Sequence, residues 1–302
     1  MKTIDIHTHL LSSDVAFQRS YDKIALRFFA KKFGMDPKAL ASDPYGEYTR
    51  ALVESVRNSQ HVEKIVLFGV DDRVDDTGKS LHKDITVCAT NEDVAALYKR
   101  KEDVNIPFFS LNPNRPDALD LIDRYADAGF RGAKFLQNYW GVDTRETRYR
   151  PYFDKLAQRS LPLIVHVGSE SSVHSFKSCE SIEMLDQPLE AGVNVICAHM
   201  ALTYEPRGIL KALSKNPKHF NSEYYTLIEM LKRHPNLYAD ISALLTPVRA
   251  KVLRHLSHQS DIHHKLLFGT DFPVPFSMIL NSYDLPYRKR FELSREATPF
   301  DR

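Results

Sequence analysis

The first residues that could do chemistry are a pair of histidines almost at the start of the chain. His7 and His9 stand in the stretch IDIHTH, residues 4–9, where apolar and polar residues alternate. This alternation predicts a short strand, and side chains two positions apart on a strand lie on the same face. The two imidazoles would then point to one place, as the ligands of a metal ion do. Two ordinary histidines on an exposed strand are the alternative at this point.

Three further polar residues come at or near the ends of later apolar runs. His166 lies in the run 161–167, His199 ends the run 193–199, and Asp271 follows the run that begins at residue 265. Short, nearly continuous apolar runs are typical of strands buried on both faces of a parallel sheet. Thirteen histidines could place one or two at strand ends by chance. Three strands ending in histidine and one in aspartate indicate a site.

The elements that would position these residues alternate regularly along the chain. Strands are predicted at 3–9, 62–70, 106–111, 132–136, 161–167, 193–199, 237–241 and 265–271. Helices are predicted at 45–58, 91–102, 117–128, 151–159, 178–190, 221–234 and 246–258. This order predicts an α/β fold, a (β/α)8 TIM barrel, as a single domain over residues 1–302. Barrel enzymes carry their chemistry at the C-terminal ends of the strands, so residues distant in sequence would converge over one mouth.

Two segments do not fit a plain barrel. A long helical insertion follows the first strand, at about 10–60, and includes an aromatic-rich helix over 16–33. We interpret this helix as facing the core, with a lid over the site as the alternative. The tail from about residue 285 is charged with little apolar periodicity, so the eighth helix of the barrel is poorly supported.

Composition gives no support for several classes of partner. The 41 basic and 39 acidic residues give a net charge of +2, which offers no argument for nucleic acid or an anionic membrane surface. No apolar stretch approaches the ~18 residues of a membrane span, and the N-terminus carries no signal-peptide pattern. The three cysteines, Cys88, Cys179 and Cys197, lack paired spacing, which favours reduced thiols in a cytoplasmic protein.

Four short motifs, read together, resemble one known family. IDIHTH at 4–9, VHVG at 165–168, AHM at 198–200 and FGTDFP at 268–273 are similar to the metal-site motifs of the amidohydrolase superfamily. The similarity is to its "amidohydrolase 2" branch, which includes aminocarboxymuconate-semialdehyde decarboxylase and related metal-dependent hydrolases. The resemblance implies one divalent metal, most often Zn²⁺ with Mn or Fe as alternatives. Its ligands would be His7, His9, His166 and Asp271.

The same resemblance places His199 beside the metal, where it would polarise a substrate oxygen or help to orient the attacking water. Three neutral imidazoles leave the ion its full charge, so a water molecule on it would be acidified. Asp271 could accept the proton of that water and pass it to the leaving group. A hydrogen-bond-donating His199 could stabilise the oxyanion on the other side. Asp271 and His199 are therefore the predicted catalytic residues.

Several other residues are weaker candidates. Lys134, on the fourth predicted strand, is interpreted as structural or substrate-contacting; some members of the superfamily carry a carboxylated lysine there that bridges two metals. The remaining candidates follow strands four and three and could contact substrate: Asn138, Tyr139, Trp140 and Arg115. Asp240 is expected to be a helix cap or a partner of a site residue. The others are expected to be solvated surface residues: His174, His263 and His264.

Two reactions could use this site. In a hydrolase, activated water attacks the carbonyl of a lactone, amide or ester of a small molecule. In a non-oxidative decarboxylase, a carboxylated aromatic or muconate-type acid loses CO2. We place the hydrolase first because it is the more general, and keep a catalytically silent metal-binding module as a third hypothesis. The resemblance also allows a homodimer.

Overall fold

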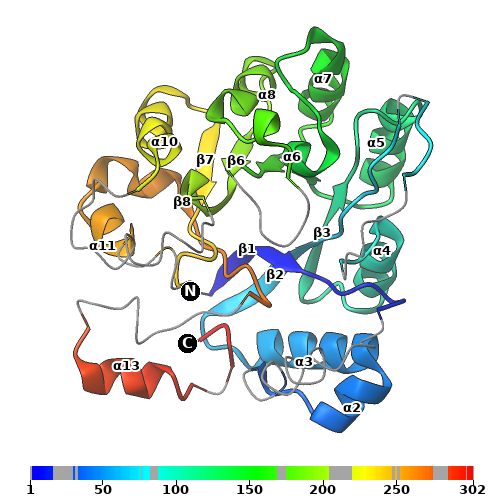
Figure 1. The fold of residues 1–302 in the computed structure, drawn as a ribbon. Coiled ribbons are helices and arrows are strands. Elements are labelled where there is room, and N and C mark those ends of the chain that lie inside the picture. Colours follow the sequence, from blue (N-terminus) through cyan, green and yellow to red (C-terminus); the bar gives the residue numbers. More distant parts are fainter. Residues whose placement is uncertain are drawn as a thin grey trace.

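The computed structural model describes residues 2–15, 30, 33–75, 77–81, 88–168, 175–203, 220–246, 249, 252–274, 285–296 and 298–301. All eight predicted strands are present and pair in parallel, each with the next in chain order. They are β1 (Thr3–His9), β2 (Val62–Phe68), β3 (Asn105–Ser110), β4 (Ala133–Phe135), β5 (Leu163–Val165), β6 (Val195–Cys197), β7 (Leu237–Asp240) and β8 (Leu266–Leu267). Helices surround the strands (Figure 1). The predicted (β/α)8 barrel is confirmed.

The segment that follows β8 joins the last strand to the first. Ile6 N donates to Phe268 O at 3.0 Å, and His9 N donates to Phe272 O at 2.8 Å. Asp271 N donates to His7 O at 2.8 Å between them. These bonds hold Asp271 directly beside the two histidines of β1. The join between β8 and β1 is therefore part of the site as well as part of the barrel wall.

The apolar strand residues divide between the two faces of the sheet. Val66 and Phe68 of β2 belong to a small core inside the barrel, which also contains Phe108, Ile164, Ile196 and Ala198. Their neighbours Ile65 and Leu67 pack in the larger core between the strands and the helices. A strand that is buried on both faces must be apolar at nearly every position, which is why these runs were readable in the sequence.

Most of the predicted helices are present. They are α3 (Pro44–Asn58), α4 (Asn91–Arg100), α5 (Ala118–Asp127), α7 (Arg150–Gln158), α10 (Ser222–Arg233) and α11 (Val252–Ser257). The predicted helix 178–190 is only partly right. Two 3-10 turns, Lys177–Cys179 and Ile182–Leu185, precede a short α8 (Asp186–Glu190), because Ser181 is extended with ψ at 159° and interrupts the helix. A short α6 (Gln137–Trp140) was not predicted.

The insertion after β1 supports the site from outside. The aromatic helix predicted over 16–33 lies outside the described residues except for Ala30 and Phe33, which are buried. Beyond it, α2 (Pro37–Ser42) and α3 are capped by Asp36 and Asp43. The hydroxyl of Tyr48 on α3 donates to His9 O at 2.5 Å, so this helix is fastened to the end of β1.

The C-terminal segment contains α13 (Tyr287–Leu293), which buries none of its residues. The chain then returns to the start of β2, where the carboxylate of Asp301 accepts from Gln60 N at 3.0 Å and from the Ser59 hydroxyl. The two termini accordingly lie near each other (Figure 1). Because α13 is exposed, it does not take the buried place of a barrel helix, in keeping with its charged sequence.

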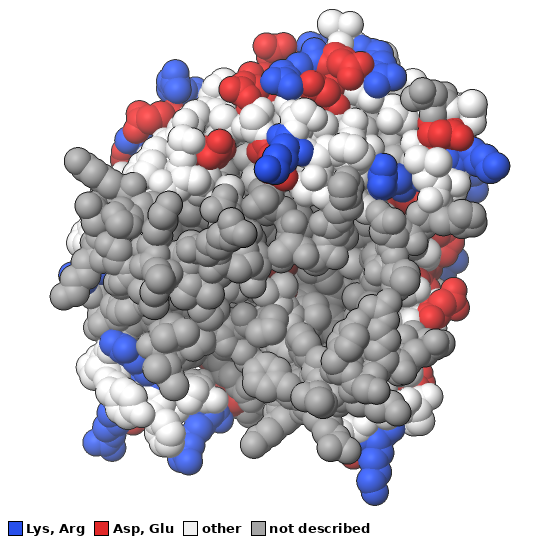
Figure 2. Space-filling view, in the orientation of Figure 1, with Lys and Arg blue, Asp and Glu red and all other residues white. Residues whose placement is uncertain are grey.

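The charged surface is mixed in sign where it can be seen. Along the edge formed by α7 and α8, Lys and Arg side chains lie next to Asp and Glu side chains (Figure 2). Arg150 pairs with Asp154 at 2.7 Å, and Lys155 pairs with Asp123 at 2.8 Å. Among the described residues, no helix is both long and apolar enough to cross a membrane.

Candidate metal centre

The two histidines of β1 converge with Asp271 at the mouth of the barrel. Oδ1 of Asp271 lies 3.0 Å from His9 Nε2 and 3.5 Å from His7 Nε2. One donor atom from each of the three residues lies within 4.8 Å of the other two. The side chain of His7 is fully buried and that of His9 is 26% exposed, so the cluster opens toward solvent on the His9 side.

Asp271 is held in place by the turn that precedes it. Its backbone has a φ of 62°, in the left-handed region that favours glycine, so the turn needs support from its surroundings. Asp5, a buried residue of β1, gives that support. It accepts hydrogen bonds from Thr270 N at 3.1 Å, Thr270 Oγ1 at 2.6 Å and His7 N at 3.0 Å. Burial raises the pKa of Asp5 to about 7, although the Thr270 bonds oppose this.

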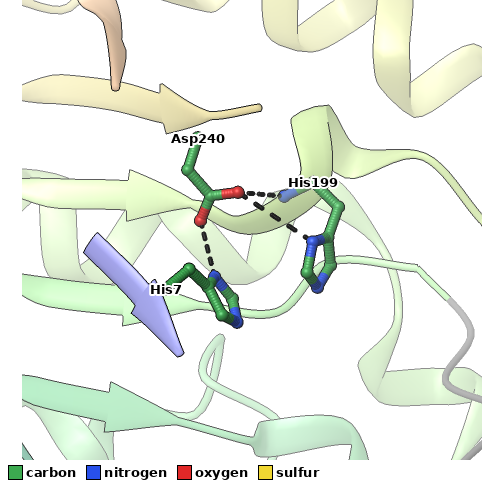
Figure 3. A group of neighbouring side chains, drawn as sticks. All are labelled: His7, His199 and Asp240. Carbon is green, nitrogen blue, oxygen red and sulfur yellow. Dashed lines mark hydrogen bonds and ion pairs between the residues drawn. The ribbon is translucent and has the colours of Figure 1, made fainter. Parts of the chain in front are cut away.

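The other nitrogen of His7 has its own partner. Nδ1 lies 2.8 Å from Oδ2 of the buried Asp240, at the end of β7 (Figure 3). A ring bonded in this way carries its proton on Nδ1 and presents the lone pair of Nε2, toward His9 and Asp271. Carboxylates orient metal-binding histidines in this manner in many proteins. The donor set of two imidazoles and a carboxylate therefore fits a divalent cation such as Zn²⁺. Asp240 is the partner of a site residue, one of the two roles expected for it.

His199 lies next to this group at the end of β6. Its ring centroid is 4.7 Å from that of His7, and its Nε2 is 3.9 Å from Asp271 Oδ2. The residue begins a run of three consecutive non-glycine residues with left-handed backbone, at φ values of 53°, 56° and 54°. Such a run is strained, and strain of this kind is kept where it places a functional side chain.

His166 lies one step further from the ligand group. It is buried, and its ring meets that of His199 edge to face with centroids 5.3 Å apart. Its carbonyl accepts a hydrogen bond from Gln137 on α6. Among the described residues, the two groups whose donor atoms lie within 4.8 Å are His7–His9–Asp271 and His7–His199–Asp240. His166 is in neither group, so its role as a ligand stays a prediction.

Burial keeps two of the imidazoles neutral. Loss of hydration lowers the pKa of His7 well below its ordinary value, and the nearby Lys134 lowers it further. Burial, followed by the charge of Arg249, has the same effect on the pKa of His199. A neutral imidazole is the form that binds a metal or accepts a proton. Both residues are therefore in the form that the proposed chemistry needs.

The predicted substrate residues are found in different surroundings. Lys134 is buried, with Nζ 3.2 Å from His7 Nε2 and 4.8 Å from the centre of the Phe68 ring, so it faces the metal centre. Arg115 forms a two-pronged pair with Asp71, at 2.7 and 2.6 Å. The remaining three, Asn138, Tyr139 and Trp140, are buried on α6, and Trp140 Nε1 donates to Asp71 O at 3.1 Å. His174 lies outside the described residues, and His263 Nε2 donates to Leu256 O on α11 at 2.9 Å.

Four residues near the centre were not identified from the sequence. They are Asp5, Ser242, Arg249 and Gly269. Arg249 is 5% exposed and its Nη2 donates to Leu202 O at 3.0 Å, at the end of the left-handed turn that carries His199. Gly269 lies so close to His7 that an added Cβ would be 3.0 Å from the His7 Cβ. Asp5 and Gly269 stand within the motifs at 4–9 and 268–273, so the sequence held a signal for these two, whereas Ser242 and Arg249 lie outside every motif.

Comparison with known proteins identifies the class. A family model described as amidohydrolase matches residues 4–279, and the chain belongs to this family. A search of curated proteins found no match. The fold is shared with solved structures of low identity. One is an uncharacterized TIM-barrel protein from Bordetella bronchiseptica, with 18% identity, a TM-score of 0.58, and coverage of 99% of this chain and 93% of that one.

Two other solved structures differ in their named activity. A 2,6-dihydroxybenzoate decarboxylase, complexed with 2,6-dihydroxybenzoate, is 15% identical with a TM-score of 0.53 over 100% of this chain and 95% of that one. An amidohydrolase from Burkholderia multivorans with bound zinc is 13% identical with a TM-score of 0.52 over 97% and 89%. The fold thus carries both decarboxylases and amidohydrolases. In this chain, His7, His9 and Asp271 form a group that could hold a metal ion.

Proposed function

We propose that this protein is a metal-dependent hydrolase that attacks the carbonyl of a lactone, amide or ester of a small molecule. The observation that carries the proposal is the convergence of His7 Nε2, His9 Nε2 and Asp271 Oδ1 at one point of the barrel mouth. These three residues would hold one divalent ion, Zn²⁺ first by donor type. When bound, the ion supplies Lewis acidity, which makes water more acidic and polarises a carbonyl oxygen.

The residues around the ion would supply the proton transfers. Oδ1 of Asp271 faces the two histidines and Oδ2 faces His199, so we assign to Oδ2 the proton of the attacking water. His199 Nε2 lies 3.9 Å from this oxygen, and a water between the two could be held by both. Asp271 would then return the proton to the leaving group. The positions of His199 and Asp271 support the catalytic roles predicted for them.

The second candidate, a non-oxidative decarboxylase, is favoured by one specific observation. Lys134 places a buried amine 3.2 Å from His7 Nε2, and Arg249 is buried next to the turn of His199. Cations inside a barrel mouth suit a substrate that carries a carboxylate. The 2,6-dihydroxybenzoate decarboxylase that shares the fold acts on such an acid. Lys134 is then the residue that would hold the acid group.

One experiment separates the two reactions. Purified protein, loaded with Zn²⁺, is assayed against a panel of lactones, esters and amides and against aromatic and muconate-type acids, with release of CO2 measured in parallel. The proposal expects hydrolysis that is lost on chelation and restored by Zn²⁺, without CO2. Release of CO2 with no turnover of the carbonyl panel would replace the hydrolase with the decarboxylase. If chelation abolishes neither hydrolysis nor CO2 release, both metal-dependent reactions are overturned.

A further inference from the structure

The second histidine group, His7 with His199 and Asp240, has the composition of a metal site, but its hydrogen bonds differ from those of the first group. Figure 3 shows the Asp240 carboxylate on one side of both rings, with one nitrogen of each ring facing it and the other pointing away. Asp240 Oδ2 lies 2.8 Å from His7 Nδ1. Its other oxygen, Oδ1, accepts from His199 N at 2.9 Å, from Ser242 N at 3.0 Å and from the Ser242 hydroxyl.

The position of the proton on His199 follows from its partners. Nδ1 of His199 lies 3.1 Å from Ser242 O, and a carbonyl oxygen can only accept a hydrogen bond. Nδ1 must therefore carry the proton. The same nitrogen lies 2.7 Å from Ser242 Oγ, whose own proton is donated to Asp240, so Oγ is free to accept from His199. A neutral ring with its proton on Nδ1 has a bare lone pair on Nε2.

His7 is fixed in the same tautomer by partners on both sides. The Asp240 carboxylate oxygens receive four hydrogen bonds from donors if His7 Nδ1 is one of them, and a carboxylate has no proton to give. On the other side, Nζ of Lys134 lies 3.2 Å from Nε2, and an ammonium can only donate. The proton of His7 therefore also lies on Nδ1.

We propose that Asp240 and Ser242 are positioning residues that fix the tautomers of both histidines, Asp240 directly at His7 and Ser242 as the link to His199. The Nε2 lone pairs of the two rings are thereby directed away from Asp240 and toward Asp271, where the metal and the water would lie. The Nδ1 atoms are committed to hydrogen bonds, so the His7–His199–Asp240 group is the support of the metal centre and holds no ion of its own.

This arrangement also assigns a role to His199. This assignment, unlike the tautomers themselves, rests on the proposed function. A neutral ring with a bare Nε2 can accept a proton from water but cannot donate one to an oxyanion. Of the two roles suggested by the family resemblance, orientation of the water fits this geometry, and polarisation of a substrate oxygen does not. The strained turn of His199, with its N–H held by Asp240, keeps the ring in this position.

The tautomers can be measured without any substrate. Metal-free protein labelled with ¹⁵N in histidine is examined by long-range ¹H–¹⁵N correlation, which distinguishes a protonated from a bare ring nitrogen, and His7→Gln and His199→Gln assign the signals. The proposal expects Nδ1–H and bare Nε2 for both residues in the wild-type protein. A proton on Nε2 of either ring would overturn it for that residue, whatever the enzymatic activity proves to be.

Asp240→Asn gives the sharper test. Three donors fix the amide oxygen in the place of Oδ1, which leaves the amide NH2 facing His7 Nδ1. His7 should then switch to the Nε2–H tautomer while His199 keeps Nδ1–H through Ser242 O. Zn²⁺ affinity, measured by competition with a chelating dye, should fall about 10- to 100-fold. An unchanged His7 tautomer and affinity in a folded variant would contradict the proposal.

Ser242→Ala and a matched control separate the link from a general effect on packing. Ser242→Ala should leave the His7 tautomer unchanged and the Zn²⁺ affinity within about threefold of the wild-type value. It should change the His199 ring signals and, for an active enzyme, lower kcat with little change in KM. Thr144→Val removes another buried hydroxyl, which donates to Met184 O at 2.8 Å away from the histidines, and should change none of these. His199 signals that respond equally to both variants would sink the role of Ser242.

Discussion

The two nitrogens of the His7 ring face regions of opposite character. On the Nδ1 side, the carboxylate of Asp240 is fully buried and both its oxygens are hydrogen-bonded. On the Nε2 side, two lone-pair donors and a carboxylate oxygen crowd within 4.8 Å, with His9 partly open to solvent. His9 Nε2 lies 3.0 Å from Asp271 Oδ1 and Lys134 Nζ lies 3.2 Å from His7 Nε2, and a divalent cation could replace these hydrogen bonds with bonds to His7, His9 and Asp271. The comparison suggests a rigid support on one side and an exchangeable site on the other.

The largest effect should come from the exchangeable side. Asp271→Asn keeps the size of the side chain but removes the charge that balances the ion and the oxygen that accepts the proton. We expect kcat/KM for the carbonyl substrate to fall roughly 10²- to 10⁴-fold, with weaker metal binding. Asp261→Asn, at a surface pair with Lys232, serves as the control and should leave both values unchanged. Equal activity of the two variants would remove Asp271 from the mechanism.

Removal of the metal should affect stability next. A ligand that binds only the folded protein stabilises it by about 2.7 kcal/mol at a free concentration of 100 Kd. Chelation should therefore lower the Tm measured by differential scanning calorimetry, and Zn²⁺ should restore it. His9→Ala should abolish the difference between the two Tm values. A Tm that is unaffected by chelator and by Zn²⁺ in the wild-type protein would speak against an ion at this place.

Gly269→Ala perturbs both sides of His7 at once. An added Cβ would lie 3.0 Å from the Cβ of His7 and 3.1 Å from the Cβ of Ser242, so one or both must move. We expect unfolding by urea to show a loss of about 1–3 kcal/mol, together with weaker Zn²⁺ binding. Gly192→Ala, where no atom lies within 4 Å but φ is 83°, measures backbone strain alone. Metal affinity should be unchanged there.

The smallest effect is expected at a carboxylate that serves neither side. Hydrogen bonds from Arg50 hold the pKa of Glu47 below its ordinary value, and Asp36 N also donates to it at 2.6 Å. Because the folded-state pKa is lowered, this stabilisation is present above the unfolded-state value and is lost as pH falls through the folded-state value. Arg50 is 44% exposed, so water screens the pair.

Glu47→Gln should therefore cost only about 0.5–1 kcal/mol at pH 7, measured by urea unfolding, and the difference from wild type should shrink as the pH is lowered below 4. Zn²⁺ affinity should not change. A difference between the two proteins that grows in acid would mean that the hydrogen bonds do not favour the ionised form of Glu47.

The sequence was sufficient for residues whose placement depends on local periodicity. His7 and His9 share a face because a strand has a period of two, and Asp271 meets them because the ends of barrel strands converge. The support of the site was less accessible. Asp240 and Ser242 contact His7 and His199, which come from other strands, and such contacts depend on register. His166 stays a predicted ligand; its ring meets that of His199 edge to face, and no strand-end rule could give that orientation.

The helices show the same limit. The helix predicted at 178–190 has apolar residues at helical spacing, yet Ser181 is extended and divides it. Arg115 stays a predicted substrate contact from its position after β3, and the structure adds that Asp71 engages its guanidinium on two nitrogens. A position after a strand identifies the correct end of the barrel; which side chains face its axis is decided by pairing partners that lie far away in sequence.

Anomalous diffraction from crystals soaked in Zn²⁺ tests the central claim most directly. The account predicts one anomalous peak at full occupancy within bonding distance of His7 Nε2, His9 Nε2 and Asp271, with Asp240 still on His7 Nδ1. Asp271→Asn should weaken that peak. A peak between His7, His199 and Asp240, on the Nδ1 side, or no peak at the barrel mouth, would contradict the assignment of the two sides of His7.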